Sequence, residues 1–171
     1  MFLKTVTELA ADFSDVRPAL LRDPGEWLAG LGAEAADEGD RLVVQVGLEV
    51  AGHQIGAHAL LEAGRPTISD RLVVLPVRLR ARDHRRLFPT MDGSLDVAWL
   101  GRDRTYLSLN LTYEPPLGVM GKLADRTLLH RVAETVVQRL LEAVANELLA
   151  RARVCGARAL GAVNETGDAA D

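Results

Sequence analysis

The sequence predicts an α+β fold in which an antiparallel sheet is followed by one long C-terminal helix. Apolar and polar residues alternate over residues 42–50, 71–82 and 94–113, and this period of two is typical of strands. Helical periodicity takes over after the prolines at 115–116 and continues to about Arg153. Because the strands form an uninterrupted run and do not alternate with helices, we do not expect a nucleotide-binding βαβ fold.

The chain is expected to open with one strand and two short helices. Residues 2–9 are rich in β-branched and apolar types, which favour a strand. A short helix is predicted over residues 14–21, with Ser14 as its cap. A second helix is predicted to begin after Asp23, whose carboxylate would accept hydrogen bonds from the first amides. Its apolar side would carry Trp27, Leu28 and Leu31.

Three strands are predicted between the short helices and residue 82. Residues 42–50 and 55–63 form one expected hairpin, with a turn between them. A third strand is predicted over residues 71–82, with its apolar residues on one side and Arg78, Arg80 and Arg82 on the other. Pro76 cannot donate to a ladder, so this strand should be interrupted or bulged at that position.

The clearest hairpin is predicted over residues 94–100 and 105–113. Leu95, Val97 and Trp99 share one face of the first strand, and Leu107, Leu109, Leu111 and Tyr113 share one face of the second. A slip by one residue would turn one of these sets to solvent, so odd-numbered residues must pair with odd-numbered ones. The connection therefore needs an odd number of residues or a bulge. The wetter face would carry Ser94, Asp96, Ser108, Asn110 and Thr112.

The terminal helix is predicted over about residues 119–153, a length on the order of 50 Å at ~1.5 Å per residue. Its apolar stripe is formed by Leu129, Ala133, Val136, Val137, Leu140, Leu141, Val144 and Leu148. Such a stripe has to be covered, and only the sheet is large enough to cover it. Residues 1–153 are therefore expected to form a single domain, and residues 154–171, poor in large apolar side chains, are expected to be a disordered tail.

Composition excludes several classes of function. The chain has 171 residues and a net charge of −4, which does not favour nucleic acid as a partner. The N-terminus lacks a signal peptide and no stretch is apolar enough to span a membrane, so we expect a cytoplasmic protein. Cys155 is the single cysteine and the four histidines are scattered, so neither a metal site nor a cofactor is predicted. The sequence also lacks a phosphate loop and a nucleophile elbow.

The block "LFPTMDGSLDVAWLGRDRTYLSLNLTYEPPLGVMGKLADRTLLHRVAETVV", together with the order of elements and the terminal helix, resembles the START-like superfamily, also called SRPBCC. The similarity covers about residues 2–150 and is most like a bacterial branch of the superfamily, which also includes polyketide cyclases and aromatases, lipid-transfer domains and plant allergens. It implies a helix-grip fold, in which a curved antiparallel sheet of six to seven strands wraps around the long helix. It also implies a cavity that holds an apolar small molecule. Because the superfamily shares no catalytic motif, the resemblance transfers no functional residue.

A cavity is also expected from geometry, because a curved sheet cannot rest flush against a straight helix. The alternative is that the inward side chains simply pack together. The candidate ligand-binding residues are Leu75, Val77, Leu79, Leu95, Val97, Trp99, Leu107, Leu109, Leu111 and Tyr113 on the strands, and Arg126, His130, Ala133 and Val137 on the helix. With an aromatic content of 4%, this lining is mainly aliphatic and suits a lipid-like or alicyclic molecule.

Arg126 and His130 lie one helical turn apart near the edge of the apolar stripe. If the stripe faces a cavity, they could hold a carboxylate or a ketone, with Tyr113 or Trp99 as further donors. The plainer interpretation is that Arg126 reaches solvent or pairs with a sheet carboxylate and that His130 is structural.

These observations leave three functional hypotheses. The leading one is a carrier or sequestering protein for a small apolar ligand. The second is an enzyme of the polyketide cyclase, aromatase or dehydratase kind, in which Arg126 and His130 act on a carbonyl. The third is an interaction domain with a collapsed cavity, docking a protein on its outer sheet. The oligomeric state stays open, with a homodimer as one alternative.

The arginine-rich run at residues 78–86 is the densest cluster of charge in the sequence. It could favour an anionic membrane surface or an acidic partner. More often such a run is a solvated strand exterior and turn, and Arg80 would then face Asp96 across the sheet.

Overall fold

The computed structural model describes residues 1–29, 31, 59–81, 90–113 and 126–165, and within these ranges it leaves the side chains of residues 59, 81, 126–132 and 155–165 undescribed. The predicted strand at 42–50, most of the strand at 55–63, the arginines at 82, 85 and 86 and the predicted helix start at 119–125 lie outside the described residues.

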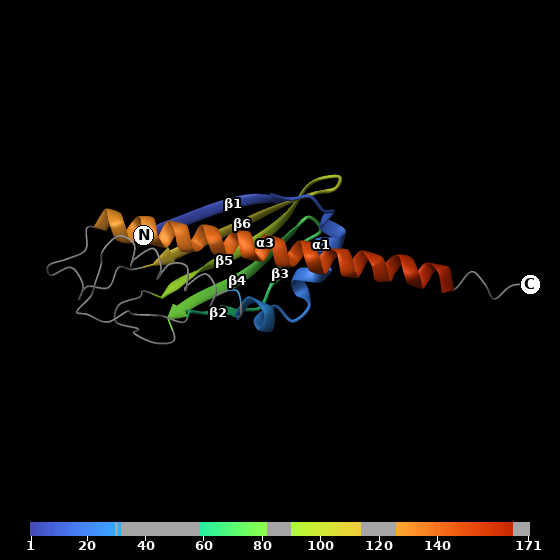
Figure 1. Cartoon of the computed structure of the whole chain (residues 1–171), viewed down its shortest axis with the longest axis horizontal. Helices are drawn as coiled ribbons and strands as arrows, with labels where there is room; N and C mark the ends of the chain where they lie inside the picture. Colours follow the sequence, from blue (N-terminus) through green and yellow to red (C-terminus); the bar gives the residue numbers. More distant parts are fainter. Residues whose placement is uncertain (30, 32–58, 82–89, 114–125, 166–171) are drawn as a thin grey trace, which may run out of the picture.

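The described strands form one six-stranded sheet in which neighbouring strands are antiparallel (Figure 1). The strands are β1 (Phe2–Leu9), β2 (Ala59–Ala63), β3 (Thr67–Ile68), β4 (Leu72–Ala81), β5 (Met91–Gly101) and β6 (Arg104–Tyr113). Their order across the sheet is β1-β6-β5-β4-β2, and β3 pairs with β4. The N-terminal strand thus lies beside β6, and the predicted antiparallel sheet is confirmed, although the short strand β3 was not predicted.

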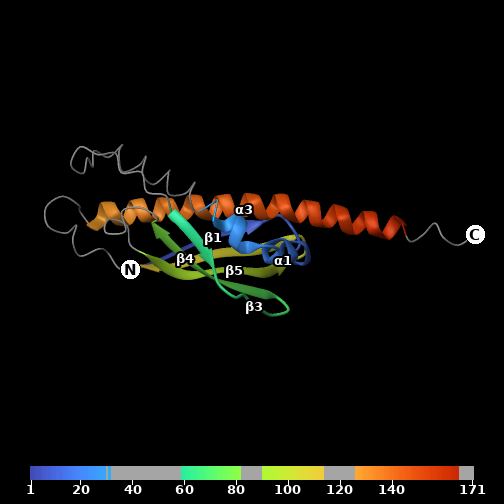
Figure 2. The same ribbon diagram turned by 90° about the horizontal axis from the view of Figure 1, so that it is seen from below.

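Three helical segments accompany the sheet in the described part of the chain. Helix α1 (Phe13–Leu21) follows β1, and residues 24–29 are also helical. Helix α3 (Arg126–Glu165) lies along one face of the sheet and continues past α1 in both views (Figures 1 and 2). The prediction ended this helix near Arg153 and expected a tail from 154, yet the chain is helical as far as Glu165. Residues such as Ala157, Arg158 and Leu160 are good helix formers, so absence of large apolar groups does not end a helix.

The cap of α1 differs from the prediction. The N-cap is Asp12, and its side chain accepts a hydrogen bond from the Ser14 amide at 2.8 Å. Ser14 therefore lies inside the helix, because an aspartate two residues earlier satisfies the amide that needs a partner. Asp23 was expected to cap the next helix with its carboxylate, and it precedes the helical residues 24–29 with a φ of 51°, in the left-handed region. Its backbone carbonyl accepts from the Glu26 amide at 3.1 Å.

The β5–β6 hairpin confirms the predicted register. Leu95 pairs with Leu109 and Val97 pairs with Leu107, so odd-numbered residues lie opposite odd-numbered ones. The predicted irregularity is a register shift between Trp99 and Gly101, just before the turn. Asp103 in the turn has a φ of 58°, which an aspartate tolerates better than most residues do.

Pro76 does not interrupt β4, contrary to the prediction. It pairs with Ser94 in a continuous β4–β5 ladder. Its carbonyl accepts from the Gly64 amide at 2.8 Å, which places the backbone groups of Pro76 on the side away from β5. The missing N–H therefore costs the β5 ladder nothing. On the other side of β4, Pro76 lies between Val74, which pairs with β3, and Val77, which pairs with β2.

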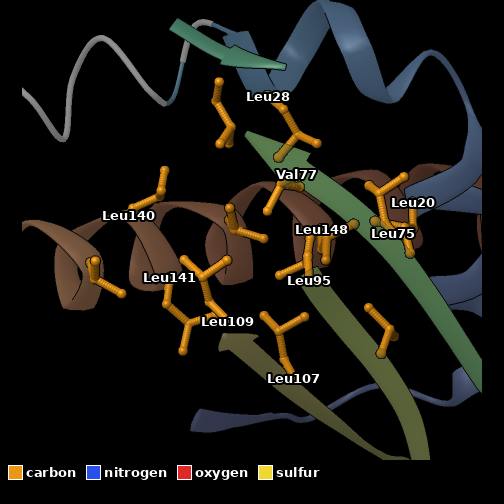
Figure 3. Packing of buried hydrophobic residues seen from close by; sticks show 14 of the residues in the cluster. Leu20, Leu28, Leu75, Val77, Leu95, Leu107, Leu109, Leu140, Leu141 and Leu148 are labelled. Atoms are coloured by element: carbon orange, nitrogen blue, oxygen red, sulfur yellow. The ribbon is translucent and has the colours of Figure 1, made fainter. Parts of the chain in front are cut away.

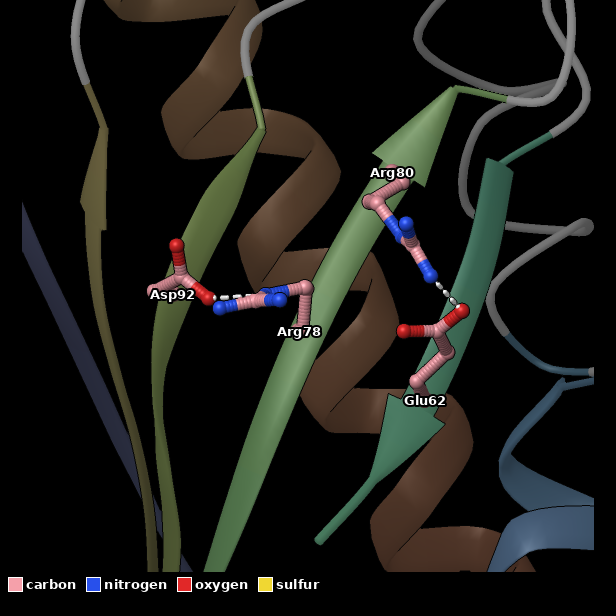
Figure 4. Close-up of polar contacts among 4 residues, drawn as sticks. All are labelled: Glu62, Arg78, Arg80 and Asp92. Atoms are coloured by element: carbon pink, nitrogen blue, oxygen red, sulfur yellow. Dashed lines mark hydrogen bonds and ion pairs between the residues drawn. The ribbon is translucent and has the colours of Figure 1, made fainter.

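The outer face of β4 carries paired charges (Figure 4). Arg78 pairs with Asp92 on β5, and Arg80 pairs with Glu62 on β2. Arg80 thus does not face Asp96, whose cross-strand neighbour on β4 is Val74. These two arginines occupy a solvated strand exterior, the plainer interpretation of the arginine-rich run.

One hydrophobic core holds the described elements together. Its fully buried side chains include Leu75, Leu95, Leu107, Leu109 and Leu111 from the sheet, and Leu140, Leu141, Val144 and Leu148 from α3. Figure 3 shows leucines of the sheet and of α3 packed against one another. The predicted helical stripe is confirmed from Ala133 to Leu148, whereas the side chain of Leu129 is outside the described part. Burial of this stripe, more than helix propensity, stabilises a helix against a sheet.

Candidate functional site

The inner face of the sheet is apolar and buried, as predicted. Its buried residues on β4, β5 and β6 are Val73, Leu75, Val77, Leu79, Leu95, Val97, Leu107, Leu109, Leu111 and Tyr113. On the helix, Ala133 and Val137 are buried against the same core. The predicted inward orientation of these residues is therefore confirmed.

The middle of this face is filled by protein. Leu75 and Leu107 are 0% exposed and Leu95 is 1% exposed, so no space large enough for water touches them. Facing them are leucines of α3 that are equally buried. Around these side chains the alternative interpretation, close packing without a cavity, is the correct one.

The burial is less complete at one end of the sheet. Leu61 lies opposite Leu79, Leu79 lies opposite Met91, and Met91 lies opposite Tyr113. Since residues directly opposite each other share a face, these four side chains form a row across four strands, which we call the end row. Met91 is 7% exposed and Tyr113 is 5% exposed, and Ala133 on α3 is 8% exposed. These side chains are buried but keep a small exposed fraction, unlike Leu75 or Leu107, as Trp27 at 8% and Phe13 at 5% also do elsewhere in the core.

The start of α3 lies at the same end. Burial raises the pKa of the Tyr113 phenol, and the carboxylate of Glu134 raises it further. The phenol is therefore the ionisable group of the end row, and it is held neutral beside a carboxylate on α3.

Arg126 and His130 fall in the first turns of α3, but their side chains lie outside the described part. The 3.6-residue period places positions 126 and 130 on the same helical stripe as Ala133 and Val137. Their predicted role in binding or catalysis stays a prediction.

Trp99 does not join the inner face. Its side chain is 44% exposed, and the guanidinium carbon of Arg71 lies 4.8 Å from its ring centroid. The register shift after Trp99 ends the regular alternation of β5, and the ring packs against the arginine outside the core. The partner of Trp99 across the ladder, Thr105, is fully buried and donates to the Ala11 carbonyl at 2.8 Å.

Two members of the end row were missed by the sequence-based reasoning. Met91 was left out because the strand was predicted to begin at residue 94, although positions 91, 93, 95 and 97 continue one alternation. Leu61 lies in a strand that was predicted without assigning its faces. The other end of the core is closed by side chains that were not proposed as core either, namely Phe13, Val16 and Leu20 of α1.

The surface of the described part also carries grooves. One of about 560 Å³ lies between β1 and α3 and is mainly polar. It is lined by Phe2, Leu3, Lys4, Thr5, Glu134, Thr135, Val137, Gln138, Arg139 and Glu142. A smaller groove of about 280 Å³ lies between α1 and α3, beside Arg22, Glu147 and Arg151. The larger groove reaches the edge of the interface between sheet and helix, because Leu3 of β1 and Val137 of the helical stripe both line it.

Two absences hold for the described ranges only. Among the residues described there, no three His, Cys, Asp or Glu side chains are grouped as metal ligands would be. Within the same part of the chain, no helix is both long and apolar enough to cross a membrane.

Comparison with known proteins adds similarities of structure. The sequence matches no protein-family model and no curated protein. Among solved structures, a conserved protein from Geobacillus kaustophilus aligns with 86% of this chain and 95% of its own, at 12% identity and a TM-score of 0.47. Ara h 8.0201 aligns with 88% of this chain and 98% of its own, at 8% identity and a TM-score of 0.47. The ZhuI aromatase/cyclase from Streptomyces sp. R1128 aligns with 90% of this chain and 93% of its own, at 16% identity and a TM-score of 0.45.

These TM-scores are below 0.5, so no function is taken from these proteins. The fold class rests on the molecule itself: the antiparallel strand order, the odd-with-odd register and the buried stripe of α3. By these features the chain has a helix-grip fold, in which an antiparallel sheet packs along one long C-terminal helix.

Proposed function

We propose that this protein binds a small apolar molecule, lipid-like or polyketide-like, between the end row and the start of α3, and that it carries or sequesters the molecule unchanged. The observation that supports this most directly is the end row itself. Leu61, Leu79 and Met91 form a continuous apolar surface beside Tyr113, at the end of the core where side chains keep some exposure. Residues 1–153 act in this proposal as one domain, located in the cytoplasm.

The chemistry of the end row suits an apolar ligand. Burial of about 200 Å² of apolar ligand surface would contribute about 5 kcal/mol, at ~25 cal/mol per Å². The flexible thioether of Met91 can adapt its shape to different occupants, which a β-branched side chain cannot. The sealed middle of the core favours a ligand held at the end of the sheet over one threaded along the whole helix.

Tyr113 is the polar anchor in this proposal. Its phenol is neutral over the physiological range, because burial and Glu134 raise its pKa. A neutral phenol can donate a hydrogen bond to a carbonyl or carboxylate oxygen of the ligand. One such bond contributes about 1 kcal/mol, so Tyr113→Phe should weaken binding several-fold without abolishing it.

The first test is mass spectrometry of the natively purified protein, with a search for a co-purifying apolar compound. The second test is titration with a dansyl-labelled fatty acid. Met91→Trp would fill the space at the end row and should weaken binding at least about tenfold, since an overfilled pocket cannot repack freely.

Thr112→Trp is the matched control, because Thr112 lies exposed on the outer face beside this end of the sheet. It should leave affinity for the probe unchanged. Equal binding by wild type and Met91→Trp, with no co-purifying compound, would refute the proposed site.

An enzyme of the polyketide cyclase, aromatase or dehydratase kind is the second candidate. It is favoured by the positions of Arg126 and His130, which fall on the Ala133 and Val137 stripe at the same end as the end row. An arginine there would polarise a carbonyl and a histidine would move a proton. Conversion of a linear polyketone, lost in His130→Ala while fatty-acid binding persists, would favour the enzyme over the carrier.

A further inference from the structure

The β1 edge of the sheet is open to pairing. In the strand order β1 occupies one end of the sheet, with β6 on its inner side (Figure 1). No described strand pairs with its outer edge. An edge of this length, eight residues, presents a row of backbone donors and acceptors that soluble proteins normally protect.

The pairing with β6 determines which residues face outward along this edge. The Tyr113 amide donates to the Met1 carbonyl at 2.9 Å, and the Met1 amino group donates to the Tyr113 carbonyl. Met1 and Tyr113 therefore form a hydrogen-bonded pair, and in an antiparallel ladder such pairs recur at every second residue. The odd-numbered residues of β1 thus bond to β6. The even-numbered residues, Phe2 to Glu8, direct their N–H and C=O groups to the open edge.

The side chains on these even positions are exposed and self-complementary. Val6 is 49% exposed, an unusual state for an apolar side chain in the middle of a strand. Lys4 and Glu8 are both exposed, carry opposite charges, and lie at equal distances in sequence from Val6. A two-fold axis through Val6 would place Lys4 of each copy opposite Glu8 of the other.

We propose that β1 pairs with β1 of a second copy of this chain, antiparallel and centred on Val6, to form one continuous sheet. In this register every outward backbone group between Lys4 and Glu8 finds a partner, and both ion pairs form. The two-fold axis stands perpendicular to the sheet, so both α3 helices lie on the same face.

Other registers fit less well. Centring the pair on Lys4 would place two lysines opposite each other, which is destabilising. Centring it on Thr5 would place Lys4 opposite Val6 and leave both charges without a partner. A shift that pairs even with odd positions would leave the outward backbone groups unmatched. The side-chain charges and the backbone hydrogen bonds together therefore favour the register centred on Val6. Glu8 already pairs with Arg104 on β6, and in the dimer it would lie between two cations.

Sedimentation of charge variants tests this register. Wild type should sediment as a dimer whose dissociation depends on concentration. Lys4→Glu alone places the new carboxylate against Glu8 of the other copy, and Glu8→Lys alone places the new ammonium against Lys4, so each should weaken dimerisation at least about tenfold. In an equimolar mixture of the two single variants, a mixed dimer places opposite charges against each other at both contacts, so dimers should form again. The double variant Lys4→Glu with Glu8→Lys exchanges the two charges within one chain. It re-forms both ion pairs and should also sediment as a dimer. Circular dichroism of each variant shows that it is folded.

Cross-linking supplies a second test that does not depend on charge. Residues opposite each other in a hydrogen-bonded pair have Cα atoms about 5.5 Å apart, within reach of a disulfide. Val6→Cys should therefore form a cross-linked dimer on mild oxidation. Phe2→Cys is the matched control, on the same face of the same strand and 62% exposed. In the proposed register the two copies of residue 2 lie about 26 Å apart and should not cross-link. Wild-type protein, with Cys155 alone, controls for other disulfides.

A wild-type protein that sediments as a monomer at every concentration would overturn the proposal and leave the edge to a strand of another protein. Dimers that persist in both charge variants, or equal cross-linking at residues 2 and 6, would overturn it as well. None of these readouts involves the apolar ligand, so the dimer and the proposed binding function can fail separately.

Discussion

Glu134 on α3 lies close enough to Tyr113 on β6 to act on its ionisation: burial raises the pKa of the phenol, and the Glu134 carboxylate raises it further. This relationship joins the last strand to the first turns of the long helix. It also makes the end row the part of the core whose energetics should respond to alkaline pH.

Tyr113 should titrate above its ordinary value of 10.0. The protein has two tyrosines, so the absorbance titration of wild type minus that of Tyr113→Phe isolates this phenol. Glu134→Gln removes the smaller of the two causes and should shift the midpoint part of the way down. A difference curve with its midpoint at or below 10 would contradict burial of the phenol.

The same shift predicts how stability changes with pH. A phenol whose folded pKa is raised contributes stability that is fully present below its unfolded pKa, about 10, and is lost as pH rises through the folded value. The free energy of unfolding of wild type should therefore fall relative to that of Tyr113→Phe between about pH 9 and 12. Urea unfolding across this range measures the difference, which should be constant at neutral pH.

Gly93 should not tolerate a side chain. A Cβ built at this position would overlap the backbone carbonyl of Asn110 on β6, and a backbone cannot yield as a side-chain end can. Gly93→Ala should lower the free energy of unfolding by about 1–3 kcal/mol or more. Gly101→Ala is the matched control, because it lies in the same strand with nothing within 4 Å, and should stay within about 0.5 kcal/mol of wild type. Equal stability of the two variants would show that the strands can separate at Gly93.

Asp12 should stabilise α1 as its N-cap. Loss of the acceptor in Asp12→Ala should cost about 1 kcal/mol at neutral pH, and Asp12→Asn, which keeps an acceptor, should cost less. The Ser14 amide lowers the pKa of this carboxyl. The Asp12 carboxylate therefore adds to the free energy of unfolding above its unfolded pKa, and this contribution is lost as pH falls through the folded pKa. The gap between wild type and Asp12→Ala should narrow below about pH 4 in thermal unfolding.

Leu140 should matter for stability as part of the buried stripe of α3. It is 0% exposed within the core, so Leu140→Ala should cost about 2–5 kcal/mol in urea unfolding. Leu100→Ala makes the same chemical change at a side chain that is 42% exposed and should cost far less. Similar losses in both would argue against close packing between α3 and the sheet.

Sequence periods of two and of 3.6 residues were sufficient to predict which face of a strand or helix packs against the core. The odd-with-odd pairing of Leu95 with Leu109 followed from the need to keep both on the core side, and the bulge beside Trp99 followed from the length of the connection. The stripe of Leu140 and Leu148 followed from helical spacing. In each case the hydrophobic effect acts on positions that local geometry already places together.

The predictions that failed concerned the contacts of a residue with neighbouring strands, caps or side chains. Pro76 was expected to break β4, but its missing N–H faces Gly64 and not β5. Ser14 was expected to cap α1, yet Asp12 occupies that position. Trp99 continues the inward alternation in sequence, but packs outside the core against Arg71. Each outcome depends on a neighbouring backbone or side chain that sequence spacing does not identify.

The sequence by itself determined the class of fold and the inward faces of β4, β5, β6 and α3, because periodicity separates apolar from polar positions along a single element. Only the tertiary structure decided that the middle of the core is filled, and that Leu61, Leu79, Met91 and Tyr113 lie in one row across four strands. Packing between elements depends on distances across the sheet and to the helix, and these arise only when strands far apart in sequence come together.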